Sequence, residues 1–190
     1  MFTQFHAVMK YPVLGALPLL LIGWWLSAAK PAPTADKMRW YTMEEVIAIK
    51  SANPDDDKAI FIDVYTDWCG WCKRMDATTF RDKDVQAILQ EEYYAVKFDA
   101  EQKEAIEMGE RTYQFVAQGR RGYHELAAEL LQGRMSYPSC VFLDQDMNLI
   151  QPVPGYRKAD EMLPILHFFG KEVYQRQAWP QFYQEWQASH

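Results

Sequence analysis

Two of the three cysteines in this 190-residue chain, Cys69 and Cys72, stand three positions apart. If a helix begins there, the two residues lie about one turn apart, close enough to form a disulfide. The start of a helix presents unpaired N–H groups and the positive end of the helix dipole, and both favour a thiolate over a thiol. Because the thiolate is the attacking form, we expect Cys69 to be an exposed nucleophile. We expect Cys72 to be the sheltered thiol that breaks a mixed disulfide, with Lys73 adding positive charge nearby.

Other uses of the cysteine pair fit the sequence less well. A zinc site needs further soft ligands at suitable spacing, and only Cys140 and four scattered histidines remain. Covalent haem attachment needs a histidine after the second cysteine, where Lys73 stands. A papain-like protease needs His and Asn roughly 130–150 residues downstream, and the sequence ends at His190, before that distance. We therefore favour dithiol redox chemistry without a metal or cofactor, and a structural disulfide stays open as the alternative.

A carboxylate lies inside a run of residues that is otherwise apolar. Residues 59–66 are short, apolar and β-branched, which predicts a buried strand, and Asp63 stands within them. A charge in a buried strand is costly and usually has a task. Desolvation raises the pKa of such a carboxyl, which suits proton transfer with the Cys72 thiol. The alternative is that Asp63 lies at the strand end and faces solvent.

The order of the expected elements indicates an α/β fold with a mixed sheet covered on both faces. A capping box of Thr42 and Glu45 begins the first helix. The cysteine pair opens a helix whose apolar period continues to Tyr93. The further expected elements are strands at 94–100, 139–144 and 149–153 and a helix at 160–174. Pro152 moves the last of these strands towards the sheet edge.

Residues 104–134 look like inserted material between two strands. Residues 105–116 have a glycine-centred turn between two alternating runs, which favours a hairpin. The second part is expected to be a helix that starts after Gly122 and ends at Gly133. We expect His124, near the start of that helix, to cap it or to lie on the surface.

Two further features are expected to be structural. Cys140 falls in a predicted core strand, where a free cysteine behaves as a small hydrophobe. The aromatic residues of the tail, 177–190, have near-helical spacing. We expect them to cover the core rather than to form a face that binds a partner.

The N-terminal segment differs in composition from the rest of the chain. Residues 13–29 carry no charge and lie between Lys10 and Lys30, which is typical of a secretory signal peptide. Trp24 and Trp25 near its end suit the interfacial belt of an uncleaved membrane anchor equally well. Either interpretation places the rest of the chain outside the cytoplasm, with membrane attachment through this segment in the second case.

The composition fits one domain and excludes one class of partner. Hydrophobic residues make up 49% of the chain, enough for one sizeable core. The net charge is −6 and no run is rich in Lys and Arg. Because phosphate binding needs clustered basic charge, we expect no nucleic-acid partner.

Two stretches resemble the thioredoxin-like family. Residues 61–73, FIDVYTDWCGWCK, are similar to the active-site segment of these proteins in the buried Asp, the Trp before the first Cys, the Gly after it and the final Lys. Residues 136–139, SYPS, followed by a predicted strand, are similar to the cis-proline segment, with Pro138 at the position of that proline. The resemblance covers about residues 40–175 and is broken by the insertion.

The resemblance implies a thioredoxin fold and roles for individual residues. Cys69 would be the nucleophile, Cys72 the resolving thiol and Asp63 the general acid and base. We therefore divide the chain into a signal peptide or membrane anchor (1–29), a linker (30–40), a thioredoxin-like domain (41–176) and a helical aromatic tail (177–190).

The residues around the cysteines would form the substrate site, namely Trp68, Gly70, Trp71, Tyr137 and Pro138. Two of them depart from the family pattern. The second residue between the cysteines is most often proline, and here it is Trp71. The residue before the cis-proline is commonly small or β-branched, and here it is Tyr137. We expect these two aromatic side chains to flank the sulfur of Cys69 from opposite sides and to narrow access to it.

The sequence thus predicts an extracytoplasmic, periplasmic thiol–disulfide oxidoreductase, similar to exported bacterial thioredoxin-like proteins. Its substrates would be protein or peptide disulfides. No histidine lies between the cysteines to stabilise the reduced thiolate strongly. We therefore favour a reductant that receives electrons from a membrane partner. The alternatives are a disulfide oxidase or isomerase, or a binding or assembly module of a membrane-associated complex.

We expect residues 1–36 to direct export of the domain that follows. Alkaline phosphatase needs disulfides that form only in an oxidising compartment. A fusion after Asp36 should therefore be active in intact bacteria, whereas a matched fusion lacking residues 13–29 should be inactive. An inactive full-length leader fusion would contradict export. Fractionation of the active fusion then distinguishes an anchor from a cleaved signal.

Overall fold

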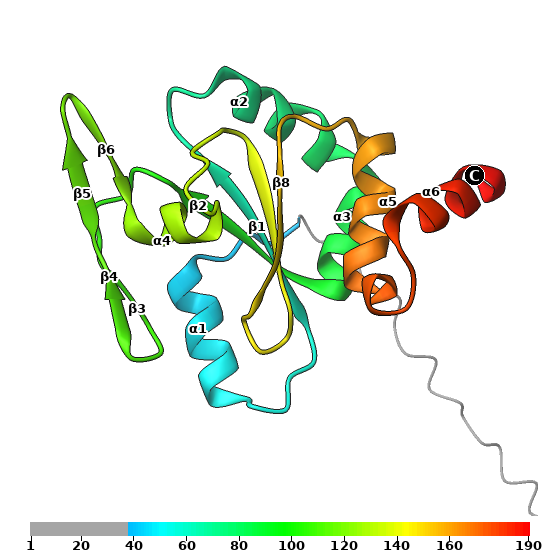
Figure 1. Cartoon of the computed structure of the whole chain (residues 1–190), viewed down its shortest axis with the longest axis horizontal. Helices are drawn as coiled ribbons and strands as arrows, with labels where there is room; N and C mark the ends of the chain where they lie inside the picture. The colour runs from blue at the N-terminus through cyan, green and yellow to red at the C-terminus, as the bar shows by residue number, and fades with distance from the viewer. Residues whose placement is uncertain (1–37) are drawn as a thin grey trace, which may run out of the picture. The chain divides into compact units, whose positions relative to one another are not determined.

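The computed structural model describes residues 38–190. The predicted signal or anchor, 1–29, lies outside the described residues. A mixed sheet forms the centre of the domain, with strand order β2-β1-β7-β8 (Figure 1). Its strands are β1 (Ala59–Tyr65), β2 (Tyr93–Asp99), β7 (Ser139–Leu143) and β8 (Leu149–Pro154). β1 pairs in parallel with β2 and antiparallel with β7, and β8 is an antiparallel strand at the edge.

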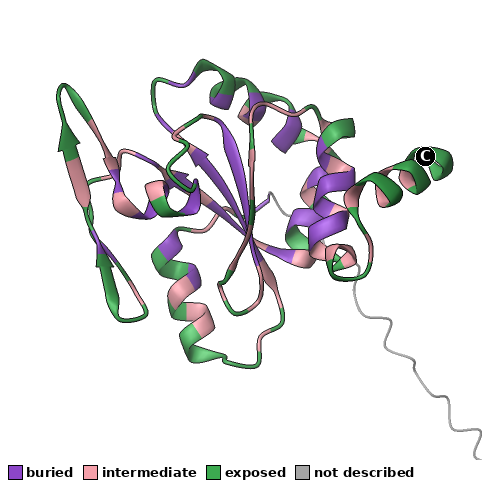
Figure 2. Cartoon of the chain, in the orientation of Figure 1, coloured by how far each residue is buried: buried purple, intermediate pink, exposed green. Residues whose placement is uncertain are grey.

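Helices cover both faces of the sheet, as the sequence predicted. They are α1 (Met43–Ala52), α2 (Gly70–Ala77), α3 (Lys83–Glu92), α4 (Glu125–Leu130) and α5 (Ala159–Gly170). Alternate side chains of a strand point to opposite faces. On β1, Phe61 joins the core beneath α2, α3 and α5, whereas Ile60, Ile62 and Val64 join the core beneath α1 and α4. Of the two central strands, β7 is buried throughout and β1 is buried except at its two end residues (Figure 2).

The core beneath α2, α3 and α5 is built around one aromatic ring. Phe61 packs edge-on against Phe142, Phe80 and Tyr93, with ring centroids 5.5, 5.9 and 6.2 Å away. Its centroid lies 6.4 Å from that of Trp40. Such tilted and edge-on pairs add to the stabilisation that the buried area supplies. The residue that alternates with Phe61 on this face of β1 is Asp63, so the same face carries the core and the buried carboxylate.

The folded domain starts earlier than the predicted boundary at residue 41. Met38 is buried, and the ring of Trp40 lies 5.0 Å from that of Phe80. The end of the stretch assigned to the linker, 30–40, therefore belongs to the domain, because two of its large apolar side chains help to close the core. No helix within residues 38–190 has the length and hydrophobicity needed to cross a membrane.

The predicted helix from the cysteine pair to Tyr93 is interrupted. α2 ends at Ala77, a 3-10 turn follows at Thr79–Arg81, and α3 begins after Asp82. The Asp82 side chain accepts the N–H groups of Asp84 and Val85. A short polar side chain that caps a new helix competes with continuation of the old one. The apolar period continues across the break because both helices pack on the same core.

The insertion contains two hairpins rather than one. The predicted hairpin is confirmed as β3 (Ile106–Met108) and β4 (Arg111–Tyr113), and Gly109 in its turn has φ +63°. A second hairpin joins β5 (Phe115–Gln118) to β6 (Arg121–His124). The helix predicted to start after Gly122 therefore starts only at Glu125. Gly122 faces β5 so closely that a Cβ there would lie 2.2 Å from the ring of Phe115.

His124 caps the helix of the insertion, which is one of the two placements expected for it. Its Nδ1 accepts the N–H of Leu126 at 3.3 Å, and its Nε2 lies 3.1 Å from the carbonyl oxygen of Glu104. The other expected placement, on the surface, is wrong, because the residue is fully buried. Both ring nitrogens have partners, which makes the burial of a polar ring tolerable.

The C-terminal part has a helix followed by a helical aromatic tail, as the sequence predicted, but the first helix ends before the expected position 174. α5 ends at Gly170, a 3-10 turn follows at Val173–Gln175, and α6 spans Trp179–Ser189. The rings of Trp179 and Phe182 each lie 5.2 Å from that of Phe168 on α5. These two side chains cover the core as expected, although no residue of α6 is fully buried.

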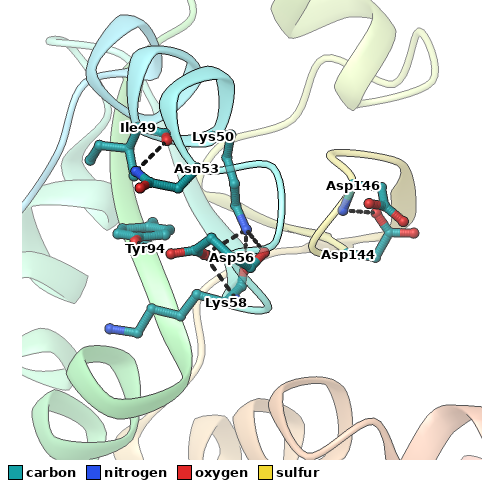
Figure 3. A network of polar contacts seen from close by, with 8 residues as sticks. All are labelled: Ile49, Lys50, Asn53, Asp56, Lys58, Tyr94, Asp144 and Asp146. Carbon is teal, nitrogen blue, oxygen red and sulfur yellow. Dashed lines mark hydrogen bonds and ion pairs between the residues drawn. The ribbon is translucent and has the colours of Figure 1, made fainter.

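A polar cluster joins the end of α1 to the start of β1 (Figure 3). The Lys50 ammonium donates to the carboxylate and the carbonyl of Asp56, both at 2.9 Å, and to the carbonyl of Lys58 at 2.6 Å. The Tyr94 hydroxyl donates to the other Asp56 oxygen at 2.8 Å. The side chain of Lys50 is only 8% exposed, so its charge depends on these partners.

Lys50→Met should lower the free energy of unfolding by about 2–4 kcal/mol, since it leaves a partly buried carboxylate without its cation. Arg39→Met is a matched control. The Arg39–Glu45 ion pair is solvent-exposed, with side chains 63% and 44% exposed. That control should change stability much less than Lys50→Met does, because exposed ion pairs contribute little. Urea denaturation measures both, and equal losses would contradict the role given to the cluster.

Candidate active site

The cysteine pair stands where β1 turns into α2. The Cys69 N–H donates to the carbonyl of Thr66 at 3.0 Å, which turns the chain after the strand. Cys69 is the N-cap of α2, and its sulfur accepts the N–H of Cys72 at 3.1 Å. The two sulfurs form a disulfide 2.06 Å long, with Cα atoms 5.3 Å apart. The helix start expected from the spacing of the cysteines is therefore present.

The expected difference in exposure between the two cysteines is small. Cys69 is 5% exposed and Cys72 is 2% exposed, so the expectation of an openly exposed Cys69 is wrong for this disulfide form. The reason is local, because the Cys69 sulfur points back into the first turn, where it meets the Cys72 N–H and sulfur. The order of their roles remains a prediction.

The tryptophans beside the cysteines are the most exposed large apolar side chains of the described chain, at 50% for Trp68 and 56% for Trp71. Trp68 meets Tyr137 edge-on, with ring centroids 5.9 Å apart. Trp71 packs against Tyr156, with centroids 5.4 Å apart. Two aromatic pairs thus lie around the disulfide, and the sequence analysis did not identify Tyr156.

The remaining predicted substrate residues lie close by in the fold. The Tyr137–Pro138 peptide bond is cis, and Pro138 is buried just before β7. The carbonyl of Pro138 accepts the N–H of Gly155 at 2.8 Å. Gly70 is exposed, and open space surrounds the place that a Cβ would occupy, so no steric contact requires glycine there.

Asp63 is buried inside β1, with 1% of its surface exposed, and it does not face solvent as the alternative expectation held. Its Oδ2 accepts the ammonium of Lys97 at 2.5 Å, and the same ammonium donates to Asp76. Its Oδ1 has no hydrogen-bond partner within residues 38–190. Burial raises the pKa of the Asp63 carboxyl to about 6, although the Lys97 ammonium opposes that rise.

The ion cluster ties α2 to the sheet behind the disulfide. Asp76 stands one helical turn after Cys72, and Lys97 lies opposite Asp63 in the parallel register of β1 and β2. Burial lowers the pKa of Lys97, but the two carboxylates outweigh it, so the net direction is upward. The ammonium also lies 5.0 Å from the ring centroid of Trp40.

Sequence reasoning missed Lys97 and Asp76. A signal for Lys97 was present, since it is a charged residue inside the second apolar strand, as Asp63 is inside the first. The signal for Asp76 was weaker, because an aspartate on a helix usually faces solvent. The spacing of four residues from Cys72 places both on the same face of α2.

The third cysteine is separate from this chemistry. Cys140 is free and buried, as expected, and it lies opposite Asp63 in the register of β1 and β7. Burial raises the pKa of its thiol well above the ordinary value. A thiol held in that form is a poor nucleophile. Within residues 38–190, no group of three or more metal-ligating side chains is gathered.

Asp63→Asn should stabilise the protein at pH 8 more than at pH 4.5. An unfolded Asp has a pKa of about 3.9, against about 6 in the fold. The folded state therefore binds more protons between these values, and wild-type stability falls as the pH rises through them. The stability difference between variant and wild type should grow by about 2 kcal/mol from pH 4.5 to pH 8.

Urea denaturation at both pH values measures this change. Asp67→Asn, which removes an exposed carboxylate close in sequence, is the control for loss of a carboxylate that is not buried. A constant difference for Asp63→Asn would contradict the raised pKa.

Comparisons with known proteins agree with this geometry. Residues 47–170 match the family model of a thioredoxin-like domain. A search of curated proteins found no match. Among solved structures, a thioredoxin-fold protein from Helicobacter pylori is similar with a TM-score of 0.51 and 19% identity, over 70% of this chain and 81% of that one. A DsbH oxidoreductase is similar with a TM-score of 0.50 and 14% identity, over 86% of this chain and 95% of that one.

Identities this low show the shared fold alone, whereas the family match covers more than half of the chain. The chain belongs to the thioredoxin-like family, and its Cys69–Cys72 pair is that of a thiol–disulfide oxidoreductase.

Proposed function

We propose that the protein reduces disulfide bonds of proteins or peptides outside the cytoplasm. The observation that carries the proposal is the Cys69–Cys72 disulfide at the start of α2 with a buried carboxylate behind it. Cys72 lies on the buried face of α2, which packs on the face of the sheet that Asp63 shares with Phe61. Asp76, one turn after Cys72, reaches the ammonium that Asp63 holds. Asp76 thus connects the helix that carries the resolving thiol to the proton acceptor on β1.

The reaction starts from the reduced dithiol. The Cys69 thiolate attacks one sulfur of a substrate disulfide, a mixed disulfide forms, and the other substrate sulfur leaves as a thiolate that takes up a proton. Asp63 then accepts the proton of Cys72, whose thiolate attacks the Cys69 sulfur and releases the second substrate sulfur as a thiolate, which takes up a proton. Asp63 afterwards gives up the proton that it accepted. Two electrons have passed from the cysteine pair to the substrate.

A group that both accepts a proton and gives it up again needs a pKa near the working pH. A carboxyl with a pKa of about 6 meets this condition. Lys97 keeps the ionised form of Asp63 tolerable in the core, and Asp76 shares that ammonium. This arrangement supports a reductant, which must deprotonate its resolving thiol in every turnover.

Each turnover leaves the pair oxidised, so a donor of two electrons has to reduce it again. We propose a membrane partner for this step, because the uncharged segment 13–29 is expected to export the domain and, as an uncleaved anchor, would hold it at the membrane.

The aromatic rim formed by Trp68, Tyr137, Trp71 and Tyr156 would favour substrates with an apolar or aromatic residue near the cysteine.

Cys72→Ser should accumulate mixed disulfides with substrate proteins, because attack continues while resolution is lost. Cys69→Ser is the matched control and should accumulate none. Non-reducing gels after acid quenching detect the adducts, and both variants should lose at least about 100-fold in insulin reduction, as expected for loss of a catalytic nucleophile. Equal gel patterns for the two variants would contradict the order of roles.

The reduction potential of the pair decides the direction. A reduction potential of about −270 mV supports a reductant, and one of about −120 mV supports an oxidase. If a double Cys→Ser variant keeps the cellular role of the protein, the binding or assembly function is favoured instead.

A further inference from the structure

The inserted hairpin β5–β6 reaches the residue that precedes the nucleophile. Its tip carries two exposed arginines, Arg120 in the turn and Arg121 at the start of β6. The guanidinium carbon of Arg121 lies 4.2 Å from the centroid of the Trp68 ring. A cation over the face of an indole is attracted by the ring, so this contact holds the hairpin tip beside the cysteine pair.

Three separate segments fix the Trp68 indole. Its Nε1 donates to Glu101 at 3.1 Å, and Tyr137 of the loop before β7 meets its ring edge-on. The guanidinium of Arg121 lies over the face of the Trp68 ring. Half of the indole remains exposed, so these contacts position it without removing it from the surface that a substrate meets. The hairpin is therefore part of the rim of the active site.

The Arg121 guanidinium has no carboxylate within ion-pair distance in the described part of the chain. The nearby Glu101 already accepts the Trp68 N–H. Asp67 is also exposed beside Trp68, so the rim as a whole is not uniformly basic. An arginine fork that is held on an aromatic ring and lacks an acidic partner is prepared to bind a carboxylate.

We propose that Arg121 determines substrate specificity and selects disulfides whose cysteine has an Asp or Glu beside it. The proposal rests on the proposed function, because it describes which substrates the Cys69 thiolate meets. A carboxylate next to the substrate cysteine would pair with the guanidinium on Trp68 while the substrate sulfur approaches Cys69. The insertion thus supplies recognition, and the cysteine pair supplies chemistry.

The test uses reduced protein and short peptides that carry one cysteine activated as a 2-pyridyl disulfide. Cys69 bonds to the peptide sulfur, and the leaving thiolate takes a proton to become thiopyridone, whose absorbance gives the rate. The neighbour of the peptide cysteine is Glu, Gln or Lys. The wild type should react about three- to fivefold faster with the Glu peptide than with the Gln peptide, as expected for an exposed ion pair.

Arg121→Gln should abolish this preference, whereas Arg120→Gln should keep it. The two variants have the same net charge and differ at adjacent positions of one hairpin tip, so long-range electrostatics cancel in the comparison. Only Arg121 contacts Trp68. Arg121→Lys should keep part of the preference, since it keeps the charge without the fork. Raising the ionic strength from about 0.01 to about 1 M should remove the preference for the Glu peptide, because the Debye length then falls to about 3 Å.

The proposal is overturned if the wild type does not prefer Glu over Gln, if salt has no effect, or if both Gln variants behave alike. The assay needs only a reactive thiol. Failure of insulin reduction with a preserved Glu preference would therefore reject the proposed function and retain the carboxylate site. Insulin reduction without a preference for the Glu peptide would reject the carboxylate site and retain the proposed function.

Discussion

The active site depends on the ion pairs that the ammonium of Lys97 forms with two carboxylates. A carboxylate inside a core strand is strongly unfavourable unless a cation accompanies it. Lys97 supplies that cation from the neighbouring strand and bonds Asp63 and Asp76 together. One group therefore joins β1, β2 and α2, the three elements that meet behind the disulfide. This connection holds α2 against the sheet one helical turn after Cys72.

The features of the fold and the site that depend on residues close together in the sequence could be predicted from the sequence. The helix start at Cys69, the capping box at Thr42, the burial of Asp63 and the edge position of β8 each follow from residue type and spacing. The partners of these groups do not. Lys97, Asp76 and Tyr156 reach the site only through strand pairing and helix packing, which a periodic pattern does not specify.

The errors in predicted secondary structure have a similar origin. The residues of β6 precede a true helix, and a two-stranded hairpin this short has little periodicity of its own. The break at Thr78 was hidden because α2 and α3 bury their apolar residues in the same core. The insertion was recognised as extra material, but its contact with Trp68 connects residues far apart in sequence and was not predictable from spacing.

The two prolines of β8 have a consequence beyond the placement of that strand. Pro152 and Pro154 pair with Val141 and Ser139 and lie on the same side of the strand backbone, two residues apart. Proline has no N–H, so the outer side of this edge lacks two donors that an added strand would need. An extended segment of another chain would therefore form fewer hydrogen bonds at this edge than a sheet normally offers. The prolines make the edge a poor template for strand addition and so reduce edge-to-edge aggregation of the domain.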